Sequence, residues 1–291
     1  MTRRGDAIST ALHAAREGWR AMVDTVFPNE CAACRRWIAG EAGLLCGSCK
    51  SDIASGVELP YCRRCARTIS PLSKHDDGCP HCRSEGHWNV RDIARIGEYG
   101  GPLRDLVLAM KYAGNRRATL ALGSLLAERL AEKSWIGEID AFVPVPMHQL
   151  RRWQRPIDHA LELATATSHA LARLQRVGSR RVVPVRRAVV RRVRYEQSQA
   201  RATSMTKRIE QIRDAFAPGK RQNPTGWCAC IIDNVITSGA TLHEVSRILR
   251  LAGAKAIYAA VIGRAELLGE LPTHTEAIRA TSEMLRIKPQ T

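Results

Sequence analysis

One short stretch of the chain, residues 227–242, combines an acid, an amide and several hydroxyls in a pattern that could bind a sugar phosphate. The apolar run 228–232 is too short for a helix and rich in β-branched and small residues, which favours a buried strand. Asp233 and Asn234 are expected to end that strand. A turn with the sequence Thr237-Ser238-Gly239-Ala240-Thr241 follows, and a helical pattern then continues to Gly253.

The chemistry expected of this stretch follows from its strand-turn-helix order. Amide groups at the start of a helix have no carbonyl partner and attract anions, and the helix dipole adds to that attraction. Gly239 lets the backbone approach a phosphate closely, while Asp233 and Asn234 could bind two neighbouring ribose hydroxyls. The stretch lacks the Gly-Lys-Ser/Thr of a nucleotide triphosphate loop. The alternative is an ordinary strand-turn-helix capped by Thr or Ser.

Eight of the ten cysteines form four Cys-x2-Cys pairs, which is typical of structural zinc sites. Each pair places two thiolates on one tight turn, and two turns complete a tetrahedral site. A disulfide framework would need an export signal, and the N-terminus shows none. We expect two structural Zn²⁺ ions, paired in sequence order, with a cross-braced pairing as the alternative. The predicted ligands are Cys31, Cys34, Cys46 and Cys49 for one ion and Cys62, Cys65, Cys79 and Cys82 for the other.

The charge of the chain indicates an anionic partner. The 291 residues carry a formal charge of +17, and eight thiolates with two Zn²⁺ ions would lower it to roughly +13. The alternative explanation is that the protein comes from an organism whose proteins are generally rich in arginine. No apolar run is long enough to cross a membrane, so we expect a cytoplasmic protein. The amphipathic pattern 6–27 predicts a helix that docks on a neighbouring domain, and peripheral attachment to the inner membrane is its alternative.

Alternating strands and helices predict an α/β fold, a mostly parallel sheet flanked by helices, for the rest of the chain. Apolar runs at 139–145, 182–185 and 256–262 are expected to be strands, and 92–101 an edge strand or turn. Ligands of such sheets bind beyond the carboxyl ends of the strands. Pro144 and Pro146 must leave the sheet there, so their loop should face the same crevice as Asp233.

The stretch 227–242 resembles the phosphoribosyl-pyrophosphate (PRPP) motif of type I phosphoribosyltransferases. The wider pattern resembles the ComF competence family, whose members join such a domain to a double zinc ribbon. The resemblance covers about residues 20–265. Departures from the family pattern are Asn234 for a second acid, Pro156 for glycine, Glu196 for threonine and Gln211 for asparagine. The segments that carry the resemblance are Tyr99-Gly100-Gly101-Pro102, Lys111-Tyr112-x-Gly114 and Val143-Pro144-Val145-Pro146-Met147-His148.

The resemblance implies a phosphoribosyltransferase-like fold, PRPP with Mg²⁺ as ligand, and a role in DNA uptake and transformation. The 5′-phosphate would lie on residues 237–241 and the ribose on Asp233 and Asn234. Arg155 and an arginine-rich hood that includes Arg187 would face the pyrophosphate. The domains would be an N-terminal helix (1–28), a double zinc ribbon (29–90), the phosphoribosyltransferase-like domain (91–270) and a tail (271–291).

Three functions stay open from the sequence. The chain could bind PRPP within the DNA-uptake machinery, and whether it catalyses transfer is left open. It could be an active phosphoribosyltransferase of nucleotide metabolism. It could also be a zinc-ribbon protein that binds single-stranded DNA beside a catalytically silent α/β domain. Basic and aromatic residues flank the cysteine pairs and are expected to form a strand-binding face, with a purely structural ribbon as the alternative. They include Arg35, Arg36, Lys50, Arg63, Arg64, Arg67, Trp37, Tyr61 and Trp88.

Overall fold

A computed structural model describes residues 29–38, 43–70, 78–80, 82, 89–147, 157–174, 182–194, 212, 214–220 and 222–265. The predicted N-terminal helix, Arg155 and the predicted tail 271–291 lie outside these described residues. Those three therefore stay predictions.

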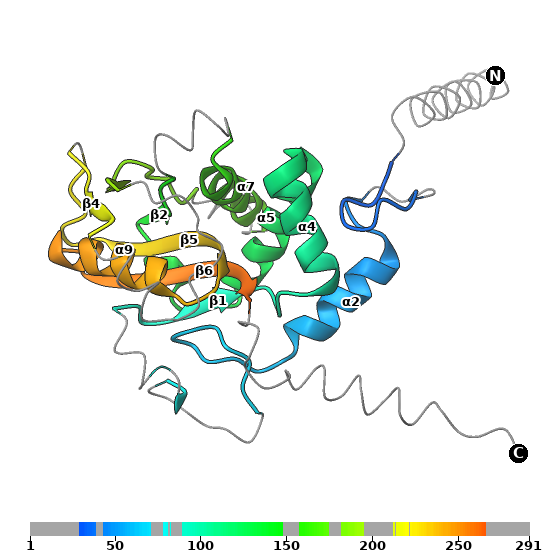
Figure 1. Cartoon of the computed structure of the whole chain (residues 1–291), viewed down its shortest axis with the longest axis horizontal. Coiled ribbons are helices and arrows are strands. Elements are labelled where there is room, and N and C mark those ends of the chain that lie inside the picture. Colours follow the sequence, from blue (N-terminus) through cyan, green and yellow to red (C-terminus); the bar gives the residue numbers. More distant parts are fainter. Residues whose placement is uncertain are drawn as a thin grey trace, which may run out of the picture.

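The centre of the molecule is a four-stranded parallel sheet (Figure 1). Its order is β1 (Ile93–Arg95), β6 (Ala256–Arg264), β5 (Cys228–Ile236) and β2 (Ala141–Pro144). Of the described strands the two central ones are the longest, and most of their side chains on both faces are apolar, as parallel strands covered by helices require. An isolated parallel bridge from Phe142 to Val185 extends the pairing on the far side of β2.

Helices cover both faces of this sheet, and alternate side chains of β5 divide between them. Cys228, Cys230 and Ile232 belong to one core with the first helices, whereas Ala229 and Ile231 belong to the core under the last helix. The first core is formed by α4 (Gly101–Ala113), α5 (Arg116–Ala131) and α7 (His159–Leu174), and the second by α9 (Ala240–Leu251) (Figure 1).

Local sequence signals explain where these helices begin and end. Pro102 occupies the first turn of α4, where its missing N–H is not needed, and Gly114 ends that helix in the left-handed conformation at φ 59°. Asn115 then caps α5 by accepting a hydrogen bond from the Ala118 amide at 3.2 Å. A single 3₁₀ turn, η1 (Ile136–Glu138), leads from α5 towards β2.

Three elements differ from the sequence predictions. β5 does not end at Asp233 but continues to Ile236, because β6 pairs with it throughout, from Cys228↔Ala256 to Ile236↔Arg264. Residues 182–185 form only the bridge at Val185 and no strand. An antiparallel pair that the sequence did not predict, β3 (Val190–Arg192) and β4 (Phe216–Pro218), stands beside the sheet.

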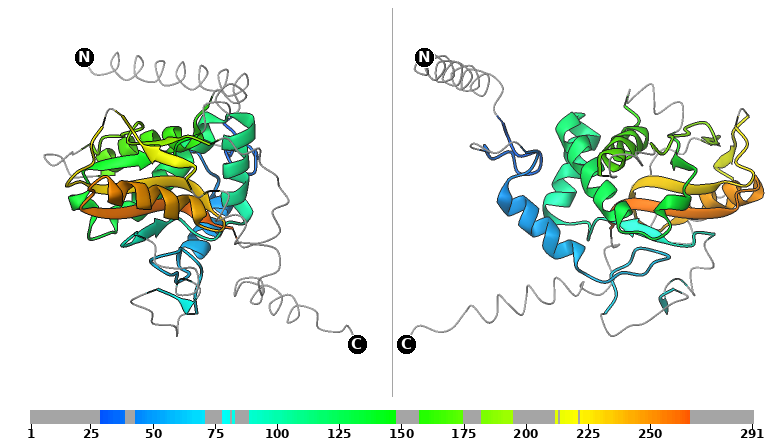
Figure 2. Two further views of the ribbon diagram at one scale, coloured as in Figure 1. Left: turned by 60° about the vertical axis from the view of Figure 1, so that its left-hand side comes forward. Right: turned by 180° about the vertical axis from the view of Figure 1, so that it is seen from behind.

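In the cysteine-rich segment, α2 (Gly47–Val57) packs against α4 at the periphery of the molecule (Figure 2). Isolated bridges from Glu30 to Trp37 and from Tyr61 to Thr68 close the two turns that carry the first and third cysteine pairs. The segment has few apolar side chains of its own besides the cysteines, so its stability depends on metal and on docking.

Candidate functional site

The corner between β5 and α9 has the backbone geometry of an anion site. Gly239 is the N-cap of α9, and its φ of 79° and ψ of −3° lie in the left-handed region that glycine adopts most easily. The first turn of the helix leaves amide groups that no helical carbonyl accepts. Ser238 is buried, and its Oγ accepts a hydrogen bond from the Ala240 amide at 3.4 Å. Thr237 is exposed, and Thr241 is half-buried.

Asp233 and Asn234 lie near the carboxyl end of β5, shortly before this corner. The Asn234 amide donates to Asp233 Oδ1 at 2.7 Å. Burial raises the pKa of the Asp233 carboxyl from its ordinary 3.8 to about 6, although that hydrogen bond and the charge of Lys111 oppose the rise. Asn234 Oδ1 is buried and has no hydrogen-bond partner. The corner therefore holds a poorly solvated carboxylate and a free acceptor, both ready for a hydroxyl donor.

Asp233→Asn is expected to stabilise the protein at pH 8. The folded carboxyl holds its proton up to about pH 6, whereas the unfolded chain releases it near 3.8, so stability falls as the pH rises through that window. The shift corresponds to at most about 3 kcal/mol, and asparagine removes the effect. Urea unfolding with zinc in excess should show the largest gain at pH 8 and about half of it at pH 5. A variant less stable than wild type at pH 8 would contradict this account.

A cationic pocket of 340 Å³ lies beyond the carboxyl end of β2. Because β2 and β5 are neighbours, with Pro144 opposite Ile232, the loops that leave both strands emerge at the same edge of the sheet. Arg187, which the sequence predicts to be part of the hood, lines this pocket, whereas Asp233 and residues 237–241 do not, and its role with a ligand stays a prediction. Its charged lining residues are Arg187, Arg191, Arg192, Lys220 and Asp158.

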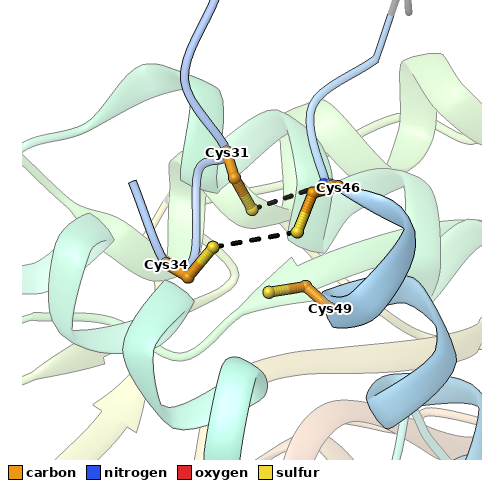
Figure 3. A group of neighbouring side chains, drawn as sticks. All are labelled: Cys31, Cys34, Cys46 and Cys49. Atoms are coloured by element: carbon orange, nitrogen blue, oxygen red, sulfur yellow. Dashed lines mark hydrogen bonds between the residues drawn. The ribbon is translucent and has the colours of Figure 1, made fainter. Parts of the chain in front are cut away.

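The first cysteine cluster brings together the four sulfurs of Cys31, Cys34, Cys46 and Cys49 (Figure 3). The Sγ atoms of Cys34 and Cys46 are 3.7 Å apart, and tetrahedral Zn–S bonds of about 2.3 Å would separate sulfurs by about 3.8 Å. Arg36 Nε donates to Cys34 Sγ at 3.4 Å, which lowers the pKa of that thiol to about 6 and favours the ligating thiolate.

The second cluster, Cys62, Cys65, Cys79 and Cys82, is buried at all four positions. Its sulfurs fit the same tetrahedron, with Sγ separations of 3.5 Å for Cys62–Cys82 and 3.6 Å for Cys65–Cys79. All four sulfurs of each cluster lie within 4.8 Å of one another. The two clusters therefore pair in sequence order rather than cross-braced, and both suit a structural Zn²⁺.

Two buried arginines, one on β1 and one on β6, hold the turn of the second cluster. Arg95 on β1 is 2 % exposed and donates from Nη1 to Ala66 O at 2.8 Å, while Arg264 on β6 is 5 % exposed and donates to Cys65 O at 3.0 Å. Tyr61 stacks over the Arg95 guanidinium with 4.8 Å to the ring centroid. This cluster is therefore built into the sheet domain rather than tethered to it.

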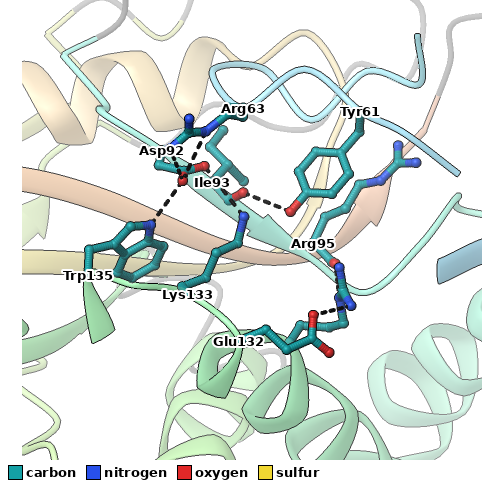
Figure 4. Close-up of polar contacts among 9 residues, drawn as sticks. Tyr61, Arg63, Asp92, Ile93, Arg95, Glu132, Lys133 and Trp135 are labelled. Atoms are coloured by element: carbon teal, nitrogen blue, oxygen red, sulfur yellow. Dashed lines mark hydrogen bonds and ion pairs between the residues drawn. The ribbon is translucent and has the colours of Figure 1, made fainter. Parts of the chain in front are cut away.

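Asp92, at the start of β1, ties the same turn to the helices (Figure 4). Its buried Oδ2 accepts from Arg63 Nη2 at 2.9 Å and from Trp135 Nε1 at 3.0 Å, and its Oδ1 lies 3.6 Å from Lys133 Nζ. Tyr61 Oη also donates to Ile93 O at 3.1 Å. Asp92 thus joins the turn of the second cysteine cluster to β1 and to the residues that follow α5.

These contacts give some residues of the predicted strand-binding face a structural role, and the face itself stays a prediction. Tyr61 and Arg63 contact β1 through Ile93 and Asp92, and Arg67 is buried, whereas most of the Arg63 side chain stays exposed. Trp37 is 63 % exposed and Trp88 lies outside the described residues. The sequence shows that the charged residues Asp92 and Arg95 flank and interrupt an apolar edge strand, but it does not identify their partners.

Comparison with known proteins agrees with both parts of this structure. Residues 22–87 match the family model of the double zinc ribbon domain. Over 245 residues the chain is 30 % identical to competence protein F of Haemophilus influenzae, covering 82 % of this chain and 98 % of that protein. It is 23 % identical over 235 residues to the DNA utilization protein YhgH of Salmonella typhimurium, covering 79 % and 94 %.

Solved structures that resemble the chain include purine phosphoribosyltransferase from Pyrococcus horikoshii, at 17 % identity over 53 % of this chain and 90 % of that one, with a TM-score of 0.30. The glutamine PRPP amidotransferase from B. subtilis gives 17 % identity over 60 % and 37 %, with a TM-score of 0.35. Likenesses at this level carry no functional argument. Within the described residues no helix is both long and apolar enough to span a membrane. From its likeness to competence protein F along most of both chains, this protein belongs to the ComF competence family, with a double zinc ribbon in front of an α/β domain built on a parallel sheet.

Proposed function

We propose that the protein binds PRPP, or a closely related phosphoribosyl ligand, at the β5–α9 corner and serves in DNA uptake during transformation. The main support for a ribose-containing ligand is the buried Asn234 Oδ1, which has no hydrogen-bond partner and lies beside Asp233. A buried acceptor without a donor is destabilising unless a ligand supplies one. The vicinal hydroxyls of a ribose are donors of the right kind for a carboxylate and an amide oxygen in one place.

The phosphate of the same ligand would lie on the backbone of residues 237–241. Gly239 turns the chain so that the first amides of α9 are left for an anion, and Ser238, Thr237 and Thr241 add hydroxyl donors. The replacement of a second acid by Asn234 keeps an acceptor for the hydroxyl. It also removes one negative charge near the anomeric carbon, which favours binding over rapid transfer.

The diphosphate group would face the cationic pocket beyond β2. Arg187, Arg191 and Arg192 present guanidinium groups that can bind phosphate oxygens bidentately. Mg²⁺ prefers oxygen ligands, and Asp233 is the charged oxygen donor at the corner. Mg²⁺ would therefore be held mainly by the ligand's own oxygens and would neutralise part of their charge.

The cellular role rests on the family. The relatives are named a competence protein and DNA utilization proteins, and the chain aligns with nearly their whole lengths. We propose by extension that single-stranded DNA and components of the uptake machinery are its partners. The formal charge of +17 supports association with a polyanion.

The ligand assignment predicts that Asp233→Ala weakens PRPP binding about 10- to 100-fold, because hydrogen bonds to a charged group contribute about 1.5–3 kcal/mol. Isothermal titration of the zinc-loaded full chain with PRPP and Mg²⁺ at pH 8 measures this. Asp105→Ala, which removes an exposed carboxylate on α4, is the matched control and should bind as wild type does. Equal affinity in the Asp233 variant, or no binding by wild type, would refute the proposal.

A further inference from the structure

An apolar groove of 540 Å³ lies between α2 of the ribbon and α5 of the sheet domain. It is separate from the β5–α9 corner and from the cationic pocket, since it shares no lining residue with either. Glu58 and Glu128 stand on its two walls, and neither forms an ion pair with another described residue. Its apolar lining includes Leu44, Leu45, Ile53, Val57, Ala121 and Leu125.

The chain enters the described structure at the head of this groove. Arg117, in the first turn of α5, donates from Nη2 to Asn29 Oδ1 at 2.7 Å, to Glu30 O at 3.2 Å and to Gly43 O at 3.1 Å. Gly43 directly precedes Leu44, which lines the groove. The residues before Asn29 therefore start next to the groove. Pro28 disfavours a helix that continues into Asn29, so the preceding segment can turn back along the groove.

That preceding segment has the composition the groove requires. Residues 6–27 have an amphipathic pattern, with Trp19, Met22, Val23 and Val26 on the apolar face nearest to Asn29. The groove wall on α5, from Ala121 to Glu132, is about 16 Å long at 1.5 Å per residue, whereas a helix over 6–27 would reach about 33 Å. The half of the segment adjacent to Asn29 is therefore long enough to fill the groove.

We propose that residues 16–27 dock as a helix in the α2–α5 groove of the same chain and so bind the ribbon to the sheet domain. Trp19, Met22 and Val26 fill the apolar floor. Arg16 and Arg20 lie one turn apart at the border of the apolar face, and Glu128 on the wall of α5 is their acidic counterpart. Docking covers apolar surface at the junction of the two parts, with Asn29 held by Arg117 as the fixed end.

Photocrosslinking in the full, zinc-loaded chain tests this. A p-benzoylphenylalanine in place of Leu125, on the groove wall, should crosslink to the peptide that contains Trp19–Val26. The same residue in place of Leu120, which is 39 % exposed on α5 and does not line the groove, should give none of that product. Mixing ¹⁴N- and ¹⁵N-labelled protein before irradiation separates products within one chain from products between two chains.

A second experiment introduces a negative charge into residues 6–27 and measures the same crosslink. Trp19→Glu should reduce the Leu125-position crosslink at least tenfold, and His13→Glu, on the polar side of the pattern, should leave it unchanged, with two zinc ions per chain in both variants. The proposal is overturned if position 125 gives no product with residues 1–28. It is also overturned if the products combine the two isotopes, which would make a second copy the occupant, or if Trp19→Glu crosslinks as wild type does.

Discussion

Cys65→Ser is expected to remove one of two zinc ions and to abolish cooperative unfolding of the sheet domain. Apparent binding free energies of structural zinc sites are about 10–16 kcal/mol, whereas whole domains are stable by about 5–15 kcal/mol. Cys65 is fully buried, and its carbonyl is the acceptor for the buried Arg264. If the turn opens, Arg264 and Arg95 lose acceptors inside the protein, which destabilises the edge of the sheet as well as the ribbon.

The matched variant is Cys34→Ser in the first cluster, where the sulfur is partly exposed. It should also lose one zinc ion, but the sheet domain should still unfold cooperatively, since the carbonyls that Arg95 and Arg264 bind belong to the other turn. Cys228→Ser, on β5 outside both clusters, should keep two zinc ions. Elemental zinc analysis and thermal circular dichroism measure these outcomes. Equal unfolding profiles for Cys65→Ser and Cys34→Ser would contradict the built-in role of the second cluster.

Asp92→Ala is expected to lower the free energy of unfolding by about 3–5 kcal/mol, the range found when one partner of a buried ion pair is removed. The Asp92 side chain is 5 % exposed and that of Lys133 is 17 % exposed, so the lysine and the Trp135 indole N–H would lose a buried acceptor. The Arg63 side chain is 64 % exposed, so water can replace its partner. The decrease in the free energy of unfolding therefore arises mainly from the contacts to Lys133 and Trp135, which follow α5.

Asp92→Asn separates charge from shape in this prediction. The amide oxygen can still accept from Trp135 Nε1, but the attraction to Lys133 is lost, so the variant should fall between wild type and Asp92→Ala. Asp52→Ala, on the exposed surface of α2, controls for simple loss of an acid and should stay within about 0.5 kcal/mol of wild type. Urea unfolding at pH 7.5 measures all three. A loss below about 1 kcal/mol for Asp92→Ala would show that the network contributes little.

Much of this molecule follows from residue type and spacing. The Cys-x2-Cys pairs predicted both clusters, because two thiolates on one tight turn are the typical half of a tetrahedral zinc site. The apolar run before Asp233 and the Gly239 turn predicted the β5–α9 corner, because a strand, a left-handed glycine and a helix each have strong local signals.

What the sequence did not show depends on contacts between distant residues. β5 runs past Asp233 because β6 continues to pair with it, and local polarity at Asp233 and Asn234 suggested the opposite. The β3–β4 pair joins segments about twenty-five residues apart, as in the register Arg191↔Ala217, within an arginine-rich stretch that looked like a loop. The use of Tyr61 and Arg63 to dock the ribbon depends on Arg95 and Asp92, which no local pattern connects to them.

The hydrogen bond from Arg264 to Cys65 joins residues 199 positions apart. During synthesis the cysteine-rich segment leaves the ribosome long before the last strand is made, and it can take up zinc at once. Its carbonyl cannot meet that guanidinium until β6 has emerged and inserted between β1 and β5. The contact between the turn of the second cluster and β6 is therefore a late, long-range step of folding, which comes after the cysteine-rich segment has been made.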